Sequence, residues 1–179
     1  MEYRYNFKMN KNSRHQTATW TMFFVTLIVL LYVFNRGSFY VPVWFLMLAL
    51  CLLFLFVMSI PKYIKVSDQC IDIHCFVELT RIPISNIAEI KTIDKKLIKK
   101  SLPIAGSYGF GGYFGYYLNL KNWTMFRMYA RQWGDDFVMI TDVYEDVFVI
   151  NCKDAENFIG FVELLIKQNE NEKEKATII

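Results

Sequence analysis

The stretch 39-FYVPVWFLMLALCLLFLFVM-58 contains 20 residues and no charge. An α-helix rises 1.5 Å per residue, so about 20 apolar residues cross a hydrocarbon core of ~30 Å. A second uncharged run, 18-ATWTMFFVTLIVLLYVF-34, lies just before it, and only Asn35-Arg36-Gly37-Ser38 separates the two. So short a connection predicts an antiparallel transmembrane hairpin over residues 18–58, with helices at about 18–34 and 39–58. The alternatives are a helical hairpin buried in a soluble core, which such long uncharged runs disfavour, and a cleaved signal peptide, for which no small-x-small site follows.

The basic residues predict the orientation of this hairpin, because positive charges collect on the cytoplasmic side of membrane helices. Arg36 is the only basic residue between the two runs. Basic residues flank the pair on both outer sides: Arg4, Lys8, Lys11, Arg14, Lys62 and Lys65. We therefore expect a multi-pass protein of the inner (cytoplasmic) membrane with both termini in the cytoplasm. Residues 1–17 form a basic cytoplasmic segment in this interpretation, and the four cysteines form no disulfides.

From Pro61 onward the apolar pattern changes to the two-residue period of β-strands. In 70-CIDIHCFV-77, for example, Ile71 and Ile73 share one face. Short runs of this kind are residues 63–67, 70–77, 81–84, 87–94, 116–120, 126–131, 137–143 and 147–152. Residues 155–168 then carry apolar side chains at helical spacing, which predicts one amphipathic helix. The expected fold is a cytoplasmic, mainly-β domain over residues 61–168, with about seven strands in a small barrel or sandwich and one C-terminal helix; residues 169–179 are expected to be a flexible charged tail.

Three segments of this domain resemble bacterial domains of the pleckstrin-homology (PH) type. The segment 81-RIPISNIAEI-90 resembles their IP-x-x-x-I-x-x-I segment, and 109-GFGGYFGY-116 is similar to the G-x-G-G-x-F-G-Y signature of one such family. The segment 149-VINC-152 followed by 154-DAENF-158 is similar to the last strand and helix of that family, with Asn151-Cys152 where Ser-Pro is usual. The resemblance covers roughly residues 61–167. It implies a PH-like fold beside membrane helices, and it implies no agreed activity and no catalytic residues.

The stretch 106-GSYGFGGYFGYY-117 alternates glycines with aromatic residues. A phosphate-binding P-loop needs Lys-Ser/Thr after its last glycine, but Tyr116 follows Gly115, and a dinucleotide fingerprint needs glycine where Phe114 stands. An enzyme or nucleotide-binding protein that uses the 106–115 loop is therefore the least favoured hypothesis. We expect a structural loop whose glycines allow positive φ or close packing, made of Gly106, Gly109, Gly111, Gly112, Phe114, Gly115 and Tyr116. The alternative is that its uncharged rings contact the bilayer interface.

The densest positive charge of the domain lies in 95-KKLIKK-100, close to Lys91. Polybasic segments beside a membrane gain about 1 kcal/mol per charge from anionic lipids. A lipid-binding site is therefore a hypothesis for Lys91, Lys95, Lys96, Lys99 and Lys100, and a solvated loop is the alternative. In eukaryotic PH domains that bind inositides, basic residues surround the first hairpin; the corresponding turn here, Ser67-Asp68-Gln69, carries no positive charge.

The sequence indicates no metal, nucleic-acid or catalytic site. Cys70 and His74 point to the opposite strand face from Cys75, so a zinc site made of these residues and Cys152 is not expected. A net charge of +3 is too small to predict nucleic-acid binding. We therefore expect no cofactor and no enzymatic activity. The favoured hypothesis is a non-catalytic scaffold at the cytoplasmic face of the lipid bilayer that binds a protein partner or its own copies, and binding of anionic lipids by residues 95–100 is the alternative.

Overall fold

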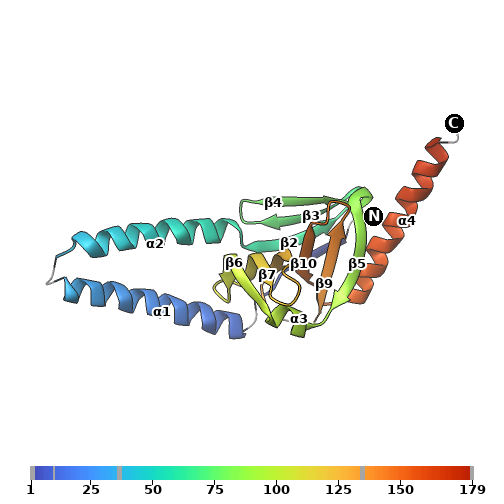
Figure 1. The fold of residues 1–179 in the computed structure, drawn as a ribbon. Coiled ribbons are helices and arrows are strands. Elements are labelled where there is room, and N and C mark those ends of the chain that lie inside the picture. The colour runs from blue at the N-terminus through green and yellow to red at the C-terminus, as the bar shows by residue number, and fades with distance from the viewer. Residues whose placement is uncertain (1–2, 10, 36–37, 134–135, 178–179) are drawn as a thin grey trace.

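The computed structural model describes residues 3–9, 11–35, 38–133 and 136–177, which Figure 1 shows as a helical hairpin attached to a β-domain. The hairpin consists of α1 (Lys11–Phe34) and α2 (Tyr40–Met58). Within the described residues, these two helices are long and apolar enough to cross a membrane, and almost none of their apolar surface is buried. α1 begins at Lys11 rather than near Ala18, because the polar residues before the apolar run continue the helix and contact the β-domain. Arg36, the only basic residue between the two uncharged runs, lies outside the described residues.

The first sheet has four antiparallel strands in the order β1-β2-β3-β4. Their bounds are β1 Tyr3–Asn6, β2 Pro61–Val66, β3 Cys70–Cys75 and β4 Leu79–Pro83. The sequence prediction missed β1, because residues 1–17 were interpreted only as a basic segment. Tyr3 packs against Phe158, with 6.0 Å between the ring centroids, and Phe7 is buried. These apolar side chains hold the segment on the edge of the sheet.

The second sheet has six strands in the order β5-β9-β10-β8-β7-β6, and its β8 and β10 run parallel. Their bounds are β5 Ile87–Ile93, β6 Ser101–Tyr108, β7 Tyr113–Asn119, β8 Met125–Ala130, β9 Phe137–Asp142 and β10 Val147–Asn151. The one-turn helix η1 (Ile84–Asn86) connects the two sheets. The prediction also missed β6, whose Pro103 and Gly106 weaken the strand pattern. The basic run before it forms a short helix, α3 (Lys95–Lys99), whose Lys96 N–H is capped by the Asp94 carboxylate.

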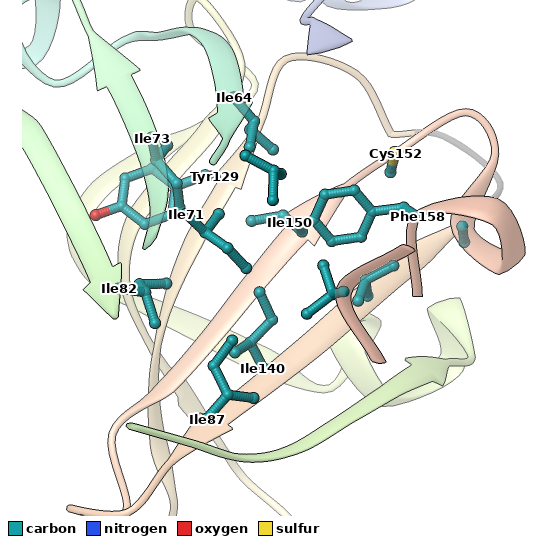
Figure 2. Close-up of a cluster of buried hydrophobic side chains, with 14 of the residues drawn as sticks. Ile64, Ile71, Ile73, Ile82, Ile87, Tyr129, Ile140, Ile150, Cys152 and Phe158 are labelled. Atoms are coloured by element: carbon teal, nitrogen blue, oxygen red, sulfur yellow. The ribbon is translucent and has the colours of Figure 1, made fainter. Parts of the chain in front are cut away.

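The two sheets face each other in a sandwich-like arrangement, and the described strands form no closed barrel. Figure 2 shows Ile71 and Ile82 of the first sheet gathered with Ile140 and Ile150 of the second, with the ring of Phe158 beside them. The core is thus shared by both sheets and by α4 (Ala155–Thr177), which contains Phe158. The predicted order of helical hairpin, mainly-β domain and C-terminal helix is confirmed, with ten strands among the described residues instead of about seven.

The C-terminal helix is longer than predicted. α4 continues to Thr177, so the backbone beyond Gln168 is helical where a flexible tail was expected. Five of the nine residues 169–177 are Glu or Lys, which are strong helix formers. They extend a helix that is already nucleated by the buried side chains of its first half. In Figure 1 this end of α4 projects away from both sheets.

Candidate functional site at the base of the helical hairpin

The hairpin formed by β6 and β7 places the glycine-rich stretch beside the base of α1. The N–H of Gly109 donates to the carbonyl of Gly112 across its turn at 2.9 Å, and we call residues 109–113, which include the first residue of β7, the glycine turn. Gly106 and Gly115 are opposite each other in the strand pair. Gly115 has a φ of 104°, and a Cβ there would lie 2.6 Å from the Cα of Gly106. Only glycine permits the two strands to approach this closely.

Two side chains near the start of α1 hold the glycine turn. Thr17 Oγ1 accepts a hydrogen bond from the N–H of Gly111 at 3.0 Å, and Gln16 Oε1 accepts one from the Tyr113 hydroxyl at 2.7 Å. A Cβ on Gly109 would lie 2.6 Å from Gln16 Oε1, so the Gln16 side chain fits against bare backbone. The β-domain is therefore fastened to the first turns of α1.

The aromatic rings of this stretch divide between the interior and the surface. Phe114 and Tyr117 are fully buried, and Tyr113 packs edge-on against Trp133. Tyr108 and Tyr116 are 47% and 44% exposed, and each lines a cavity at the base of the helices. Three of the six rings therefore pack inside the domain, while Tyr108, Phe110 and Tyr116 line the cavities beside α1 and α2.

These two cavities share Leu52, Phe56 and Gly106 as lining residues. The first, of about 420 Å³, lies between α1 and α2 and is lined almost entirely by apolar side chains. The second, of about 410 Å³, lies between the last turns of α2 and the strands β7 and β8. We call the second one the Arg127 cavity, because it contains an arginine and a glutamate beside the apolar wall of α2.

The charged pair of the Arg127 cavity is partly buried. Arg127 donates from Nη2 to Oε1 of Glu78, and 21% of the Arg127 side chain and 39% of the Glu78 side chain are exposed. The guanidinium carbon lies 5.2 Å from the ring centroid of Tyr116 and 5.3 Å from that of Tyr129. Tyr129 shares a 2.6 Å hydrogen bond with Thr80. The arginine is thus positioned by an acid and two aromatic rings.

Burial affects the ionisation of the groups around this pair. Burial disfavours the charge of Arg127, but the hydrogen bond to Glu78 and the neighbouring tyrosines raise the pKa of Arg127 above its ordinary value. Burial raises the pKa of Cys75 to about 12, and the Glu78 carboxylate acts in the same direction. Burial also raises the pKa of Tyr129, against the effect of its hydrogen bond to Thr80. At neutral pH Arg127 is charged, and the nearby thiol and phenol are neutral.

The mainly-β domain is matched by a known family. The family described as Bacterial PH domain matches residues 62–166, which run from β2 into α4. The chain belongs to this family. The resemblance found in the sequence is therefore confirmed, while no curated protein and no solved structure gives a significant match. The match begins at residue 62, so it excludes β1 and α1. Phe7, Gln16 and Thr17 therefore contact the PH domain from a part of the chain that the family match does not cover.

The lysines predicted to bind lipid lie elsewhere on the PH domain. Lys95, Lys96, Lys99 and Lys100 lie in or next to α3, which precedes β6, whereas the glycine turn follows β6 (Figure 1). Lys91 lies on β5 and pairs with Glu89 at 2.8 Å. The structure therefore brings three of these lysines together on α3, with Lys100 directly after it, and leaves Lys91 in a separate pair.

Four residues at the base of the hairpin were not predicted from the sequence, namely Gln16, Thr17, Glu78 and Arg127. Arg127 carried a local signal, because it is the only charge in the apolar strand 126-FRMYA-130. Its partner Glu78 is 49 residues away along the chain, and no local pattern indicates that pairing. Among the described residues, no group of three or more His, Cys, Asp or Glu side chains is placed to hold a metal.

Proposed function

We propose that this protein is a membrane-anchored, non-catalytic scaffold. In this proposal α1 and α2 cross the inner membrane as a hairpin, both termini lie in the cytoplasm, and the PH domain binds a protein partner or a second copy of the chain. The length and the exposed apolar surface of the two helices support the anchoring. Membership of the PH family supports a domain that binds rather than catalyses.

The observation that carries this proposal is the contact between α1 and the glycine turn. Because Gln16 and Thr17 bond to this turn from the first turns of a membrane helix, the PH domain is held in one orientation relative to the bilayer. One end of the domain then faces the membrane. The opposite end is presented to the cytoplasm, as a scaffold requires.

That opposite end carries exposed apolar side chains. β9 begins at Phe137, whose ring lies 5.9 Å from that of Trp133 beside the glycine turn, and ends at Asp142. The turn from β9 to β10 therefore lies at the far end of the domain, where the N–H of Val143 donates to Asn86 of η1. Val143 is 57% exposed and Tyr144 is 73% exposed. Aromatic side chains are enriched in protein interfaces, so we propose this turn as part of the partner surface.

The test is co-purification of the full-length chain in a mild detergent. We expect the wild type to retain a partner or a second copy, and we expect the Tyr144→Ser variant to lose it. Trp123→Ser is the matched control, because it removes a 75% exposed ring from the turn between β7 and β8. Recovery of the wild type alone, at the mass of a monomer, contradicts the scaffold proposal. Reporter fusions at both termini test the topology, and a reporter found outside the cytoplasm contradicts the orientation.

A further inference from the structure

The Arg127 cavity combines an apolar wall with a charged pair. Leu52 and Phe56 line it from α2, and Ser59 lines it just after the helix ends. At 1.5 Å per residue, residues 52–59 span about 10 Å along the helix axis. In a membrane-spanning α2, that length covers the lipid head groups and the first part of their acyl chains. The charged pair and the apolar wall therefore match the two parts of a lipid molecule.

Arg127 retains hydrogen-bonding capacity for a ligand. Glu78 accepts from Nη2, whereas the buried Nε has no acceptor in the part of the chain that the structure describes. The side chain also lines the cavity. Arginine binds phosphate through parallel, charge-assisted hydrogen bonds. Nε itself is buried, so a phosphate group in the cavity would bond to the outer guanidinium nitrogens of Arg127, whose side chain is 21% exposed.

Glu78 determines which phosphate-bearing head group fits. A head group with negative charge alone would place its phosphate beside the Glu78 carboxylate, and Arg127 alone cannot offset both negative charges. The ethanolamine head group carries an ammonium as well as a phosphate, so each of its charges meets the opposite charge of the pair. A choline head group has the same charges but no N–H to donate to Glu78.

We propose that the Arg127 cavity binds one molecule of phosphatidylethanolamine from the cytoplasmic leaflet. The phosphate pairs with Arg127, the ammonium pairs with Glu78, and an acyl chain lies along Leu52 and Phe56. This proposal rests on the membrane anchoring proposed above. The bound lipid fills the space between α2 and the six-stranded sheet, so it adds to the contacts that orient the PH domain.

Native mass spectrometry of the full-length protein tests this site. The protein is purified in a mild detergent and mixed with equal amounts of phosphatidylethanolamine, phosphatidylglycerol and phosphatidylcholine. We expect the wild type to retain phosphatidylethanolamine about tenfold better than either other lipid, which corresponds to one charge-assisted hydrogen bond. Glu78→Gln is expected to lose this preference. Arg127→Gln is expected to retain about tenfold less of every phospholipid.

The matched control is a second ion pair of the same chemistry on the exposed side of β3 and β4. Arg81 donates to Asp72 at 2.8 Å, and 61% of its side chain is exposed. Arg81→Gln and Asp72→Asn are expected to leave lipid retention unchanged. Equal retention of the three lipids by the wild type, retention of none, or an unchanged preference in Glu78→Gln overturns the proposal.

Two features of the design keep the result interpretable. Should Arg127→Gln fail to fold, Glu78→Gln decides the question, because its amide keeps the shape of the side chain. Reporter fusions on the same chain separate this proposal from the anchoring. A chain whose termini both report the cytoplasm, but which shows no preference for phosphatidylethanolamine, contradicts the lipid site alone.

Discussion

The N-terminal residues attach to the PH domain in two different ways. β1 joins the four-stranded sheet through a backbone ladder with β2, and Phe7 lies in the core. Gln16 and Thr17 instead join the six-stranded sheet through side-chain hydrogen bonds to the glycine turn. The first attachment depends on the burial of apolar side chains. The second depends on glycines, whose missing Cβ atoms leave room for the side chains of α1.

This difference shows how the PH domain is tied to the helical hairpin. β1 ends at Asn6 and α1 begins at Lys11, so one short segment reaches both sheets of the sandwich. Weakening β1 removes part of the core, whereas weakening the glycine turn releases α1 and leaves the core intact. The two attachments are therefore expected to respond differently to substitution.

Breaking the β6–β7 hairpin, which carries the second attachment, is expected to have the largest effect. An alanine at Gly115 combines a strained φ of 104° with a clash against the Cα of Gly106. Strain and overpacking each cost about 1–3 kcal/mol, so Gly115→Ala is expected to lower the free energy of unfolding by about 4 kcal/mol. Urea unfolding of the detergent-solubilised protein, followed by tryptophan fluorescence, measures this loss.

The matched glycine control is Gly160 on α4, where an added Cβ meets nothing within 4 Å. Gly160→Ala is expected to raise the free energy of unfolding by about 0.5–1 kcal/mol, because alanine is the better helix former. Similar stabilities for the Gly115 and Gly160 variants would show that the close approach of β6 and β7 does not require glycine.

Truncating Phe7, which belongs to the first attachment, is expected to have the next largest effect on the free energy of unfolding. Phe7 is 6% exposed, and Phe7→Ala is expected to cost about 3 kcal/mol through lost burial and the cavity left behind. Tyr144→Ala removes a ring that is 73% exposed, and it is expected to change the free energy of unfolding by less than about 0.5 kcal/mol. A cost for Phe7→Ala as small as that for Tyr144→Ala would mean that Phe7, which follows β1, adds nothing to the core.

The two attachments also mark the limit of what the sequence could predict. Uncharged runs and alternating residues are local signals, so α1, α2, most strands and the first half of α4 were predicted correctly. β1 has only four residues, and it pairs Tyr3 with Val66 far along the chain. The glycines were identified from composition, but Thr17 and Gly111 are 94 residues apart and only the fold brings them together. The same holds for Glu78 and Arg127, whose pairing depends on how the turn between β3 and β4 of one sheet is placed against β8 of the other.

A smaller effect is expected when the second attachment loses a single hydrogen bond. Thr17→Val keeps the shape of the side chain but leaves the Gly111 N–H without its acceptor, which costs about 1–2 kcal/mol. The amide of Gly111 is then expected to exchange with solvent about tenfold faster. Thr19→Val is the control, because its exposed hydroxyl bonds to the carbonyl of His15 on the same helix. Identical exchange rates in the two variants would argue against a fixed contact between α1 and the glycine turn.

The smallest effect on stability is expected from α3, which belongs to neither attachment. Lys96 and Lys99 are exposed, so replacing both with glutamine is expected to change the free energy of unfolding by less than about 0.5 kcal/mol. Their predicted role is at the membrane surface, where each charge gains about 1 kcal/mol from anionic lipids. In proteoliposomes, acetylation of these lysines should therefore slow about fivefold when phosphatidylglycerol replaces phosphatidylcholine, and high salt should remove the protection.

The exposed Lys121, in the turn between β7 and β8, is the reference for general changes in amine reactivity. Equal protection of Lys96, Lys99 and Lys121, or no protection of any of them, would leave α3 as a solvated helix. The protein would instead have two lipid contacts of different kinds if anionic lipid protects Lys96 and Lys99 from acetylation and the Arg127 cavity retains phosphatidylethanolamine. An exposed cluster of lysines responds to surface charge, whereas a partly buried arginine paired with an acid selects a head group, because only the second has a fixed geometry.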